Sequence, residues 1–149
     1  MSLYIVATPI GNLDDITFRA IETLKTVDVI LAEDTRHSKR LLSHYDIPTP
    51  MCAFHEHNET QKSAEVIDEL LGGKNIALIS DAGTPLISDP GYVLVSEAKK
   101  TGINVVPIPG PSAMISAMSV SGVASDRFGF FGFLPSKQSA RLKAIQAIA

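Results

Sequence analysis

Short apolar runs alternate with amphipathic segments along residues 1–111 of the chain. The apolar runs are typical of buried strands and are found at Leu3–Ala7, Val29–Ala32, Met51–Phe54, Ile76–Ile79 and Val105–Ile108. Because these runs are nearly uninterrupted by polar residues, they favour a parallel sheet that is covered on both faces. The segments between them repeat apolar residues at helical spacing. The pattern therefore predicts an α/β fold, in which an open, parallel-rich, five-stranded sheet carries helices on both faces.

Capping residues indicate where the intervening helices begin and end. Asp14 or Asp15 can cap a helix that runs to about Thr26. The pair Gly72-Gly73 can close the helix that contains Ala64 to Leu71. The other two helices are expected around Leu41–Tyr45 and over Tyr92–Thr101.

The chain after residue 111 has a different character. A rigid proline-rich bend leads into further expected elements, which are a small-residue helix at Ser112–Val120, a strand at Phe128–Leu134 and a helix from Ser139 to Ala149. One strand and one helix cannot bury their own apolar surface. We therefore expect an α/β domain over residues 1–111, a linker helix over 112–127, and the beginning of a truncated α+β domain over 128–149.

The charge, the cysteine content and the length of the apolar runs indicate the cellular compartment in which the protein is expected. The formal net charge of −3 gives no global basic field of the kind that attracts nucleic acid. Cys52 is the single cysteine, so an intrachain disulfide is excluded and a reducing compartment is expected. No charged segment precedes the first apolar run, and no apolar run reaches the roughly 18 residues of a membrane span. These features predict a cytoplasmic protein with no membrane partner.

The segment Ser80–Gly91 is the most unusual in the chain. It follows a buried strand and contains Gly83, Pro85, Pro90 and Gly91 among small polar residues. A simple connection uses about 2–6 residues, and this one is longer. Ligands of open α/β sheets bind beyond the carboxyl ends of the strands, so we predict a binding loop here rather than a long turn.

Five segments together resemble a known family. They are Thr8–Leu13, Ala32–Arg36, Ser80–Gly91, Pro107–Ala113 and Gly132–Pro135. In these segments the chain resembles the ribosomal RNA small subunit methyltransferase I family, within the tetrapyrrole methylase superfamily. The resemblance implies S-adenosylmethionine-dependent methylation of a cytidine ribose 2′-hydroxyl in the decoding region of small-subunit ribosomal RNA. It also implies a two-domain cytoplasmic homodimer whose partner is that RNA within the assembled subunit.

The resemblance also implies a donor site between the two domains. The residues carried over to it are Pro9, Ser80, Asp81, Ala82, Gly83, Thr84, Ile87, Ser112 and Ala113. Related porphyrin methylases have Gly-Asp-Pro where this chain has Gly83-Thr84-Pro85. The carboxylate of that motif is therefore absent at this position.

Methyl transfer to a hydroxyl needs positioning and a proton acceptor. Polar residues at the expected strand ends supply candidate bases, namely Asp34, His55 and Asp81, with Glu33 and His57 beside them. The sequence does not show which of these residues would accept the proton.

Basic residues after the second expected strand are candidates for RNA contacts. Arg36 is the first choice for a phosphate or the acceptor ribose, with Lys39 and Arg40 one helical turn further on. The alternative for these basic residues is a solvated helix face. His37 is expected to be an ordinary surface residue of the helix. His57 is assigned to the acceptor cleft, since His55 and His57 lack a third metal ligand at a recognisable spacing. We therefore expect no metal site.

Three other functions fit parts of the pattern. A nicotinamide dehydrogenase would use Glu33 or Asp34 as its ribose-binding acid, but the first loop contains only Gly11 instead of a G-x-G-x-x-G motif. A tetrapyrrole methyltransferase would share both the fold and the methyl donor. The third alternative is a donor-binding fragment that is catalytically incomplete.

Overall fold

A five-stranded parallel sheet forms the centre of the protein. The computed structural model describes residues 1–148. The strands are β1 (Ser2–Val6), β2 (Val29–Ala32), β3 (Met51–Ala53), β4 (Ile76–Ile79) and β5 (Asn104–Ile108). They lie in the order β3-β2-β4-β1-β5, and every neighbouring pair is parallel. The parallel five-stranded sheet expected from the apolar runs is confirmed.

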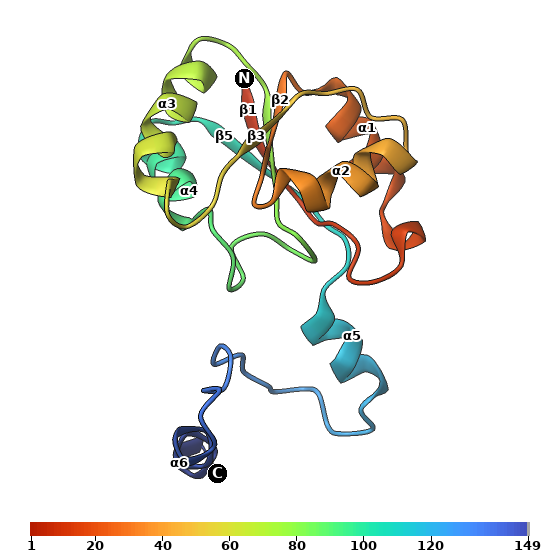
Figure 1. Ribbon diagram of the computed structural model, residues 1–149, viewed down its shortest axis with the longest axis vertical. Helices are drawn as coiled ribbons and strands as arrows, with labels where there is room; N and C mark the ends of the chain where they lie inside the picture. The colour runs from red at the N-terminus through yellow and green to blue at the C-terminus, as the bar shows by residue number, and fades with distance from the viewer. Residues whose placement is uncertain (149) are drawn as a thin grey trace.

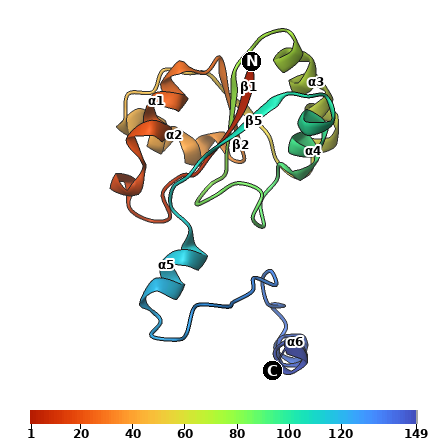
Figure 2. The same ribbon diagram turned by 180° about the vertical axis from the view of Figure 1, so that it is seen from behind.

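Helices cover both faces of this sheet (Figure 1). The helices are η1 (Leu13–Asp15, a short 3-10 turn), α1 (Phe18–Thr26), α2 (Thr35–His44), α3 (Glu59–Leu71), α4 (Tyr92–Lys100), α5 (Ala113–Val120) and α6 (Gln138–Ile148). Helices α1 and α2 lie on one face, and α3 and α4 lie on the other, as the view from behind also shows (Figure 2). The open sheet with helices on both faces is therefore as predicted.

Each face of the sheet has its own apolar core. The first core joins β1, β2 and β4 to α1 and α2, and includes Val6, Leu24 and Leu41. The second joins the sheet to α3 and α4, and includes Phe54, Leu70 and Leu94. These strands are buried on both faces, which explains why they read as unbroken apolar runs.

The first helix begins later than the sequence suggested. We expected one helix from Asp14 or Asp15, but the structure has two elements. The Asn12 side chain accepts a hydrogen bond from the backbone N–H of Asp14 (3.2 Å) and caps η1. Ile16 is then extended (ψ 142°) and turns a nearly buried side chain into the core. Thr17 caps α1 by accepting from the N–H of Ala20 (3.1 Å).

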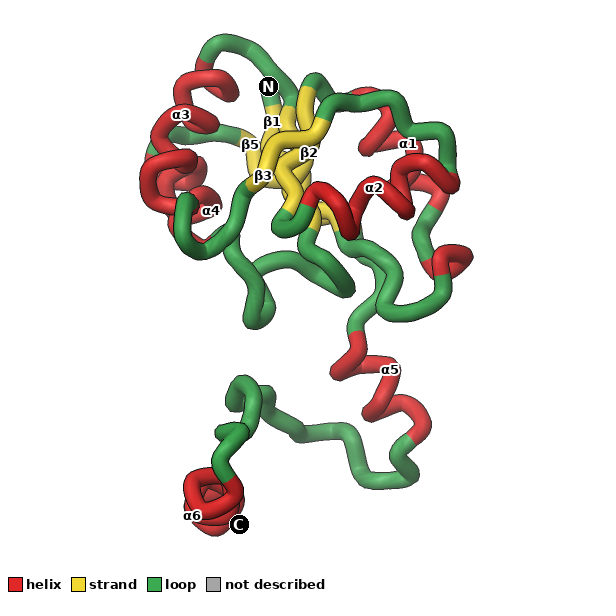
Figure 3. The backbone as a smooth tube through the Cα atoms, in the orientation of Figure 1, coloured by secondary structure: helices red, strands yellow, loops and turns green. Residues whose placement is uncertain are grey.

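The residues after β5 form no part of the sheet. Helices α5 and α6 lie beyond the carboxyl ends of the strands, joined to each other by a long loop (Figure 3). Neither helix has a buried residue. The strand expected at Phe128–Leu134 is wrong, because this segment is loop and its phenylalanines are exposed. A strand needs a neighbour for its backbone N–H and C=O groups, and no strand among residues 1–148 lies beside this segment.

The helix expected from Ser139 begins at Gln138, and Ala149 lies outside the described residues. None of the helices within residues 1–148 combines the length and the apolar character needed to cross a membrane.

Candidate functional site

Two loops at the carboxyl ends of the strands are bonded to each other. The backbones of Thr8, after β1, and Gly83, after β4, exchange hydrogen bonds of 2.9 and 3.0 Å. The Thr8 hydroxyl also donates to the carbonyl of Ser80 (3.1 Å). Gly83 has a φ of +82°, which favours glycine at this position. The two loops therefore form one fixed wall at the edge of the sheet.

The rest of the glycine-proline loop has an unusual backbone. Leu86 and Ser88 have φ values of +73° and +65°, a region that costs non-glycine residues about 1–3 kcal/mol. Gly91 has a φ of +128°, and a Cβ there would lie 2.7 Å from Leu78 Cδ2. Such a conformation persists only where the surroundings hold it.

Glu59 holds the end of this loop. Its buried carboxylate accepts hydrogen bonds from the N–H groups of Gly91 (3.0 Å) and Val93 (2.9 Å). These groups form the start of α4, where a negative charge is also favoured by the helix dipole. A residue of α3 thus fixes the junction between the loop and α4.

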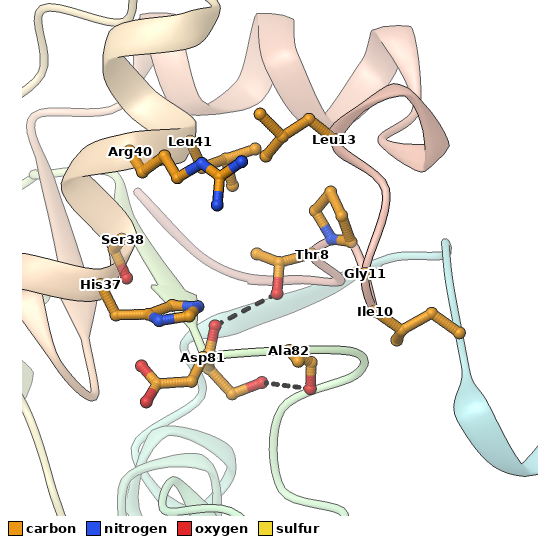
Figure 4. Close-up of a pocket in the computed structure, with 12 residues that line it drawn as sticks. Thr8, Ile10, Gly11, Leu13, His37, Ser38, Arg40, Leu41, Asp81 and Ala82 are labelled. Carbon is orange, nitrogen blue, oxygen red and sulfur yellow. Dashed lines mark hydrogen bonds between the residues drawn. The ribbon is translucent and has the colours of Figure 1, made fainter.

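A pocket of about 320 Å³ opens between α2 and the two bonded loops (Figure 4). Its lining comes from the β1 loop, from α2 and from the start of the β4 loop: Thr8, Pro9, Ile10, Gly11, Leu13, His37, Ser38, Arg40, Leu41, Ser80, Asp81 and Ala82. Figure 4 shows the Arg40 guanidinium and the His37 imidazole turned toward the wall that contains Thr8 and Asp81. The pocket therefore combines basic, hydroxyl, apolar and acidic groups.

Three carboxylates meet beside this pocket. The Asp81 carboxylate accepts from the N–H of Asp34 (3.1 Å), and the N–H of Asp81 donates to Glu33 Oε2 (3.5 Å). Burial, and then the nearby charges of Asp81 and Asp89, raise the pKa of Glu33 above its ordinary value of 4.5. Burial and the charge of Asp81 likewise raise the pKa of Asp89 above 3.8. The position of Asp89 in this group was not predicted, because its loop folds back in a way that no spacing rule describes.

Asp34 has a structural role that the sequence did not reveal. Its carboxylate caps α2 by accepting from the N–H groups of Arg36 (2.8 Å) and His37 (3.4 Å). Hydrogen bonds from the Arg36 side chain, and then from its backbone, lower the pKa of Asp34 below its ordinary value. Arg36 pairs with it at 3.2 Å, and its side chain is 91% exposed. The side chains of Asp34 and Arg36 thus form an ion pair with each other at the start of α2.

The predicted donor residues divide into two groups. Pro9, Ser80, Asp81 and Ala82 line the pocket, whereas the others lie along the loop and at the start of α5: Gly83, Thr84, Ile87, Ser112 and Ala113. The Thr84 hydroxyl donates to the carbonyl of Pro111 (3.3 Å), so the two parts of this second group are joined.

The predicted substrate residues are not brought together. Lys39 and His57 are exposed and are not part of the pocket lining. Arg40 and His37 line the pocket instead, and this assignment was missed. Helical spacing offered a signal, because His37 and Arg40 share a face with Leu41, which is buried.

His55 lies in the loop after β3. Its Nδ1 atom is buried and has no hydrogen-bond partner within residues 1–148. Its ring centroid lies 6.0 Å from that of His57. In the part of the chain that the structure describes, no group of three or more His, Cys, Asp or Glu residues is arranged to hold a metal ion.

The fold and the pocket define an α/β protein whose candidate site lies beyond the carboxyl ends of a parallel sheet, where open α/β sheets bind their ligands. Comparison with known proteins identifies the family. The chain belongs to the tetrapyrrole (corrin/porphyrin) methylase family, whose sequence model matches residues 2–148. This membership favours methyl transfer over the hydride transfer considered from the sequence.

Curated relatives match the whole chain closely. Over 147 residues the chain is 60% identical to the ribosomal RNA small subunit methyltransferase I of Haemophilus influenzae and 54% identical to that of Synechocystis sp.. These matches cover 99% of this chain but 52% and 53% of the relatives. The chain thus spans about half the length of the curated relatives it matches. The resemblance to that family is confirmed.

Solved structures share the fold at low identity. A crystal structure of diphthine synthase matches with a TM-score of 0.73 and 17% identity, over 99% of this chain and 61% of that one. Uroporphyrin-III-C-methyltransferase from Thermus thermophilus matches with a TM-score of 0.63 and 20% identity, over 83% and 52% of the two chains. These similarities support the α/β fold and assign no function to individual residues.

Proposed function

We propose that this chain supplies the α/β part of an S-adenosylmethionine-dependent methyltransferase that acts on small-subunit ribosomal RNA. The observation that carries the proposal is the 54–60% identity, over 97–99% of the chain, to relatives that bear this name. The bonded loops at the strand ends support it, since they form a rigid polar wall of the kind that a folded donor requires.

The donor is proposed to bind along the β4 loop and the start of α5. Its residues are Pro9, Ser80, Asp81, Ala82, Gly83, Thr84, Ile87, Ser112 and Ala113. Within residues 1–148, the backbone N–H groups of Ala82 and Thr84 take part in none of the loop hydrogen bonds. Free N–H groups on a fixed loop suit the polar parts of such a donor, which supplies an activated methyl group when bound.

The acceptor is proposed to be the 2′-hydroxyl of a cytidine ribose in the decoding region. A donor held by the β4 loop would supply the methyl group, and the residues of the pocket would have to position the hydroxyl and accept its proton. Among the three candidates we select Asp81, which lines the pocket, because Asp34 is engaged as the cap of α2 and His55 is not part of the lining.

The division of the chain is part of the proposal. Residues 1–111 form the α/β domain, residues 112–127 a linker helix, and residues from 128 onward the opening of a second domain, in a cytoplasmic homodimer. The large apolar side chains exposed after residue 113 support this view, since such surface is normally covered by a partner or a further domain.

A tetrapyrrole methyltransferase is the second candidate, because the family description names corrins and porphyrins. The sequence Gly83-Thr84-Pro85 counts against it, since this chain lacks the carboxylate that the related motif carries there. The third candidate is a chain that binds the methyl donor but does not catalyse methyl transfer.

The proposal is tested by calorimetric titration of the chain with S-adenosylhomocysteine, followed by transfer of labelled methyl groups to small ribosomal subunits and, separately, to a porphyrinogen. We expect binding, and we expect the label in 2′-O-methylcytidine of the subunit RNA. Asp81→Asn should abolish transfer, and Asp68→Asn, on the exposed side of α3, is the matched control. Absence of binding, or transfer to the porphyrinogen alone, would contradict the proposal.

A further inference from the structure

We propose that the pocket between α2 and the β1 loop seats one nucleotide of a single-stranded RNA acceptor, and that Arg40 neutralises a backbone phosphate there. This inference rests on the function proposed above and assigns the RNA side of that same site. Arg40 takes the role of phosphate contact that the sequence had suggested for Arg36.

The basic residues of α2 divide according to the direction of their side chains. Arg36 is directed to Asp34, with which it forms an ion pair at the first turn. Lys39 is exposed, as Arg40 is, but it does not line the pocket. Arg40 faces the pocket (Figure 4), and none of the ion pairs within residues 1–148 includes it. Of the three cations, Arg40 is therefore the one that lies over the pocket with its charge uncompensated by a carboxylate.

Packing of α2 holds Arg40 in this direction. Ser38, Leu41 and Leu42 are buried against the sheet, and this fixes the rotation of the helix about its axis. Residues three and four apart share one face of a helix, so His37 and Arg40 project together over the pocket. The Asp34 cap fixes where this helix starts. The two side chains are thus presented by a rigid element.

The chemistry of the walls suits one nucleotide. The guanidinium of Arg40 and the imidazole of His37 offer hydrogen-bond donors to a phosphate. The side chain of Leu13 gives an apolar surface for a base or sugar, and Asp81, where the pocket meets the proposed donor residues, offers an acceptor for a ribose hydroxyl. A volume of about 320 Å³ lies at the low end of the roughly 300–1,000 Å³ range of ligand pockets.

Charge also gives the acceptor an orientation. The carboxylates of Glu33, Asp81 and Asp89 lie near one another. Asp81 lines the pocket, and its negative charge repels a phosphate. Arg40 and His37 lie on α2, across the pocket from the bonded loops. A strand therefore places its phosphate against α2 and its hydroxyl toward Asp81. In this way the site distinguishes the two ends of a nucleotide without reading its base.

The test compares Arg40→Gln with Lys39→Gln, which removes the same charge from the adjacent position outside the pocket. The probe is a short fluorescein-labelled single-stranded RNA that contains cytidine, and its affinity is measured by anisotropy over a series of salt concentrations. For Arg40→Gln we expect about a tenfold loss of affinity, as for one charge-assisted hydrogen bond. The slope of log K against log salt should fall by about 0.7, as for one single-strand phosphate. Lys39→Gln should change affinity less than about twofold.

Two further measurements make the result decisive. Arg40→Lys should restore the salt slope but not the full affinity, because lysine keeps the charge and loses the planar fork. Calorimetric titration with S-adenosylhomocysteine should give the same affinity for all variants. Equal RNA affinities of Arg40→Gln and Lys39→Gln, a loss of S-adenosylhomocysteine binding in Arg40→Gln, or no RNA binding by the unmodified chain would each overturn the inference. A failure of the unmodified chain to bind S-adenosylhomocysteine would instead contradict the proposed function.

Discussion

Residues 1–111 and residues 113–148 use apolar side chains in opposite ways. Every buried hydrophobic side chain of the described chain lies in the first region, on one face or the other of the sheet. In the second region Phe128, Phe130, Phe131 and Phe133 are all substantially exposed. The first region contains strands and helices that cover each other, whereas α5 and α6 have no buried residue. The comparison teaches that burial depends on the presence of a partner surface rather than on the apolar content of a segment.

The largest expected effect comes from a matched pair of phenylalanines. Phe54 is fully buried beside α3, and Phe133 is 85% exposed. Phe54→Ala should lower the free energy of unfolding by about 3–5 kcal/mol, because it leaves a cavity in a closed core. Phe133→Ala should change it by less than about 0.5 kcal/mol. Urea denaturation measures both values, and similar losses for the two variants would break the comparison.

A polar contact within the first region should have the next largest effect. Glu59→Ala leaves the N–H groups of Gly91 and Val93 without their acceptor in a buried place, and should cost about 2–3 kcal/mol. Glu65→Ala removes a more exposed carboxylate of the same helix, paired with Lys62, and should cost less than about 1 kcal/mol. Thermal unfolding of the two variants gives the difference. Equal costs would mean that Glu59 does not hold the β4 loop.

The acidic group predicts a smaller, pH-dependent effect. The folded-state pKa of Glu33 lies above its ordinary value of 4.5. Its contribution to stability is therefore complete below about pH 4.5 and is lost as the pH rises through the folded-state value. Glu33→Gln should raise the free energy of unfolding at neutral pH by less than about 1 kcal/mol, since the group is partly screened by solvent. At acidic pH the variant and the unmodified chain should be equally stable.

The comparison can also be tested by shortening the chain. A chain that ends at Ser112 keeps the whole sheet and the hydrogen bond between Thr84 and Pro111. Its free energy of unfolding should differ by less than about 0.5 kcal/mol, because no buried side chain is removed. Chemical denaturation measured by circular dichroism gives the value. Loss of the cooperative transition would contradict the division at residue 111.

The sequence predicted the elements better than their arrangement. Unbroken apolar runs identified all five strands, because a strand that is buried on both faces must be apolar on both. The order β3-β2-β4-β1-β5 could not be derived in this way, since Leu3 pairs with Ile76 and no local pattern encodes so distant a contact. At Phe128–Leu134 a strand-like pattern lacked a neighbour, and the prediction was wrong.

The site was predicted in outline and missed in detail. The glycine-proline loop was identified because its composition is unusual for a connection. The roles of Asp34 and Arg36 depend on a capping contact that the motif does not reveal. Arg40 was placed on the same helix, but its direction follows from the side of α2 that packs on the sheet. Helical spacing together with a known sheet order would have been needed to find it.

The strand order has a consequence for folding during synthesis. β1 precedes the other described strands in the chain, yet both of its neighbours, β4 and β5, are made much later. β2 and β3 are adjacent in the sheet and are connected through α2 alone, so their pairing closes a shorter loop. Pulse-labelled hydrogen exchange should therefore find the amides of β1 protected after those of β2. β1 therefore stays unpaired until β4 and β5 have been made, and the sheet is complete once both have paired with it.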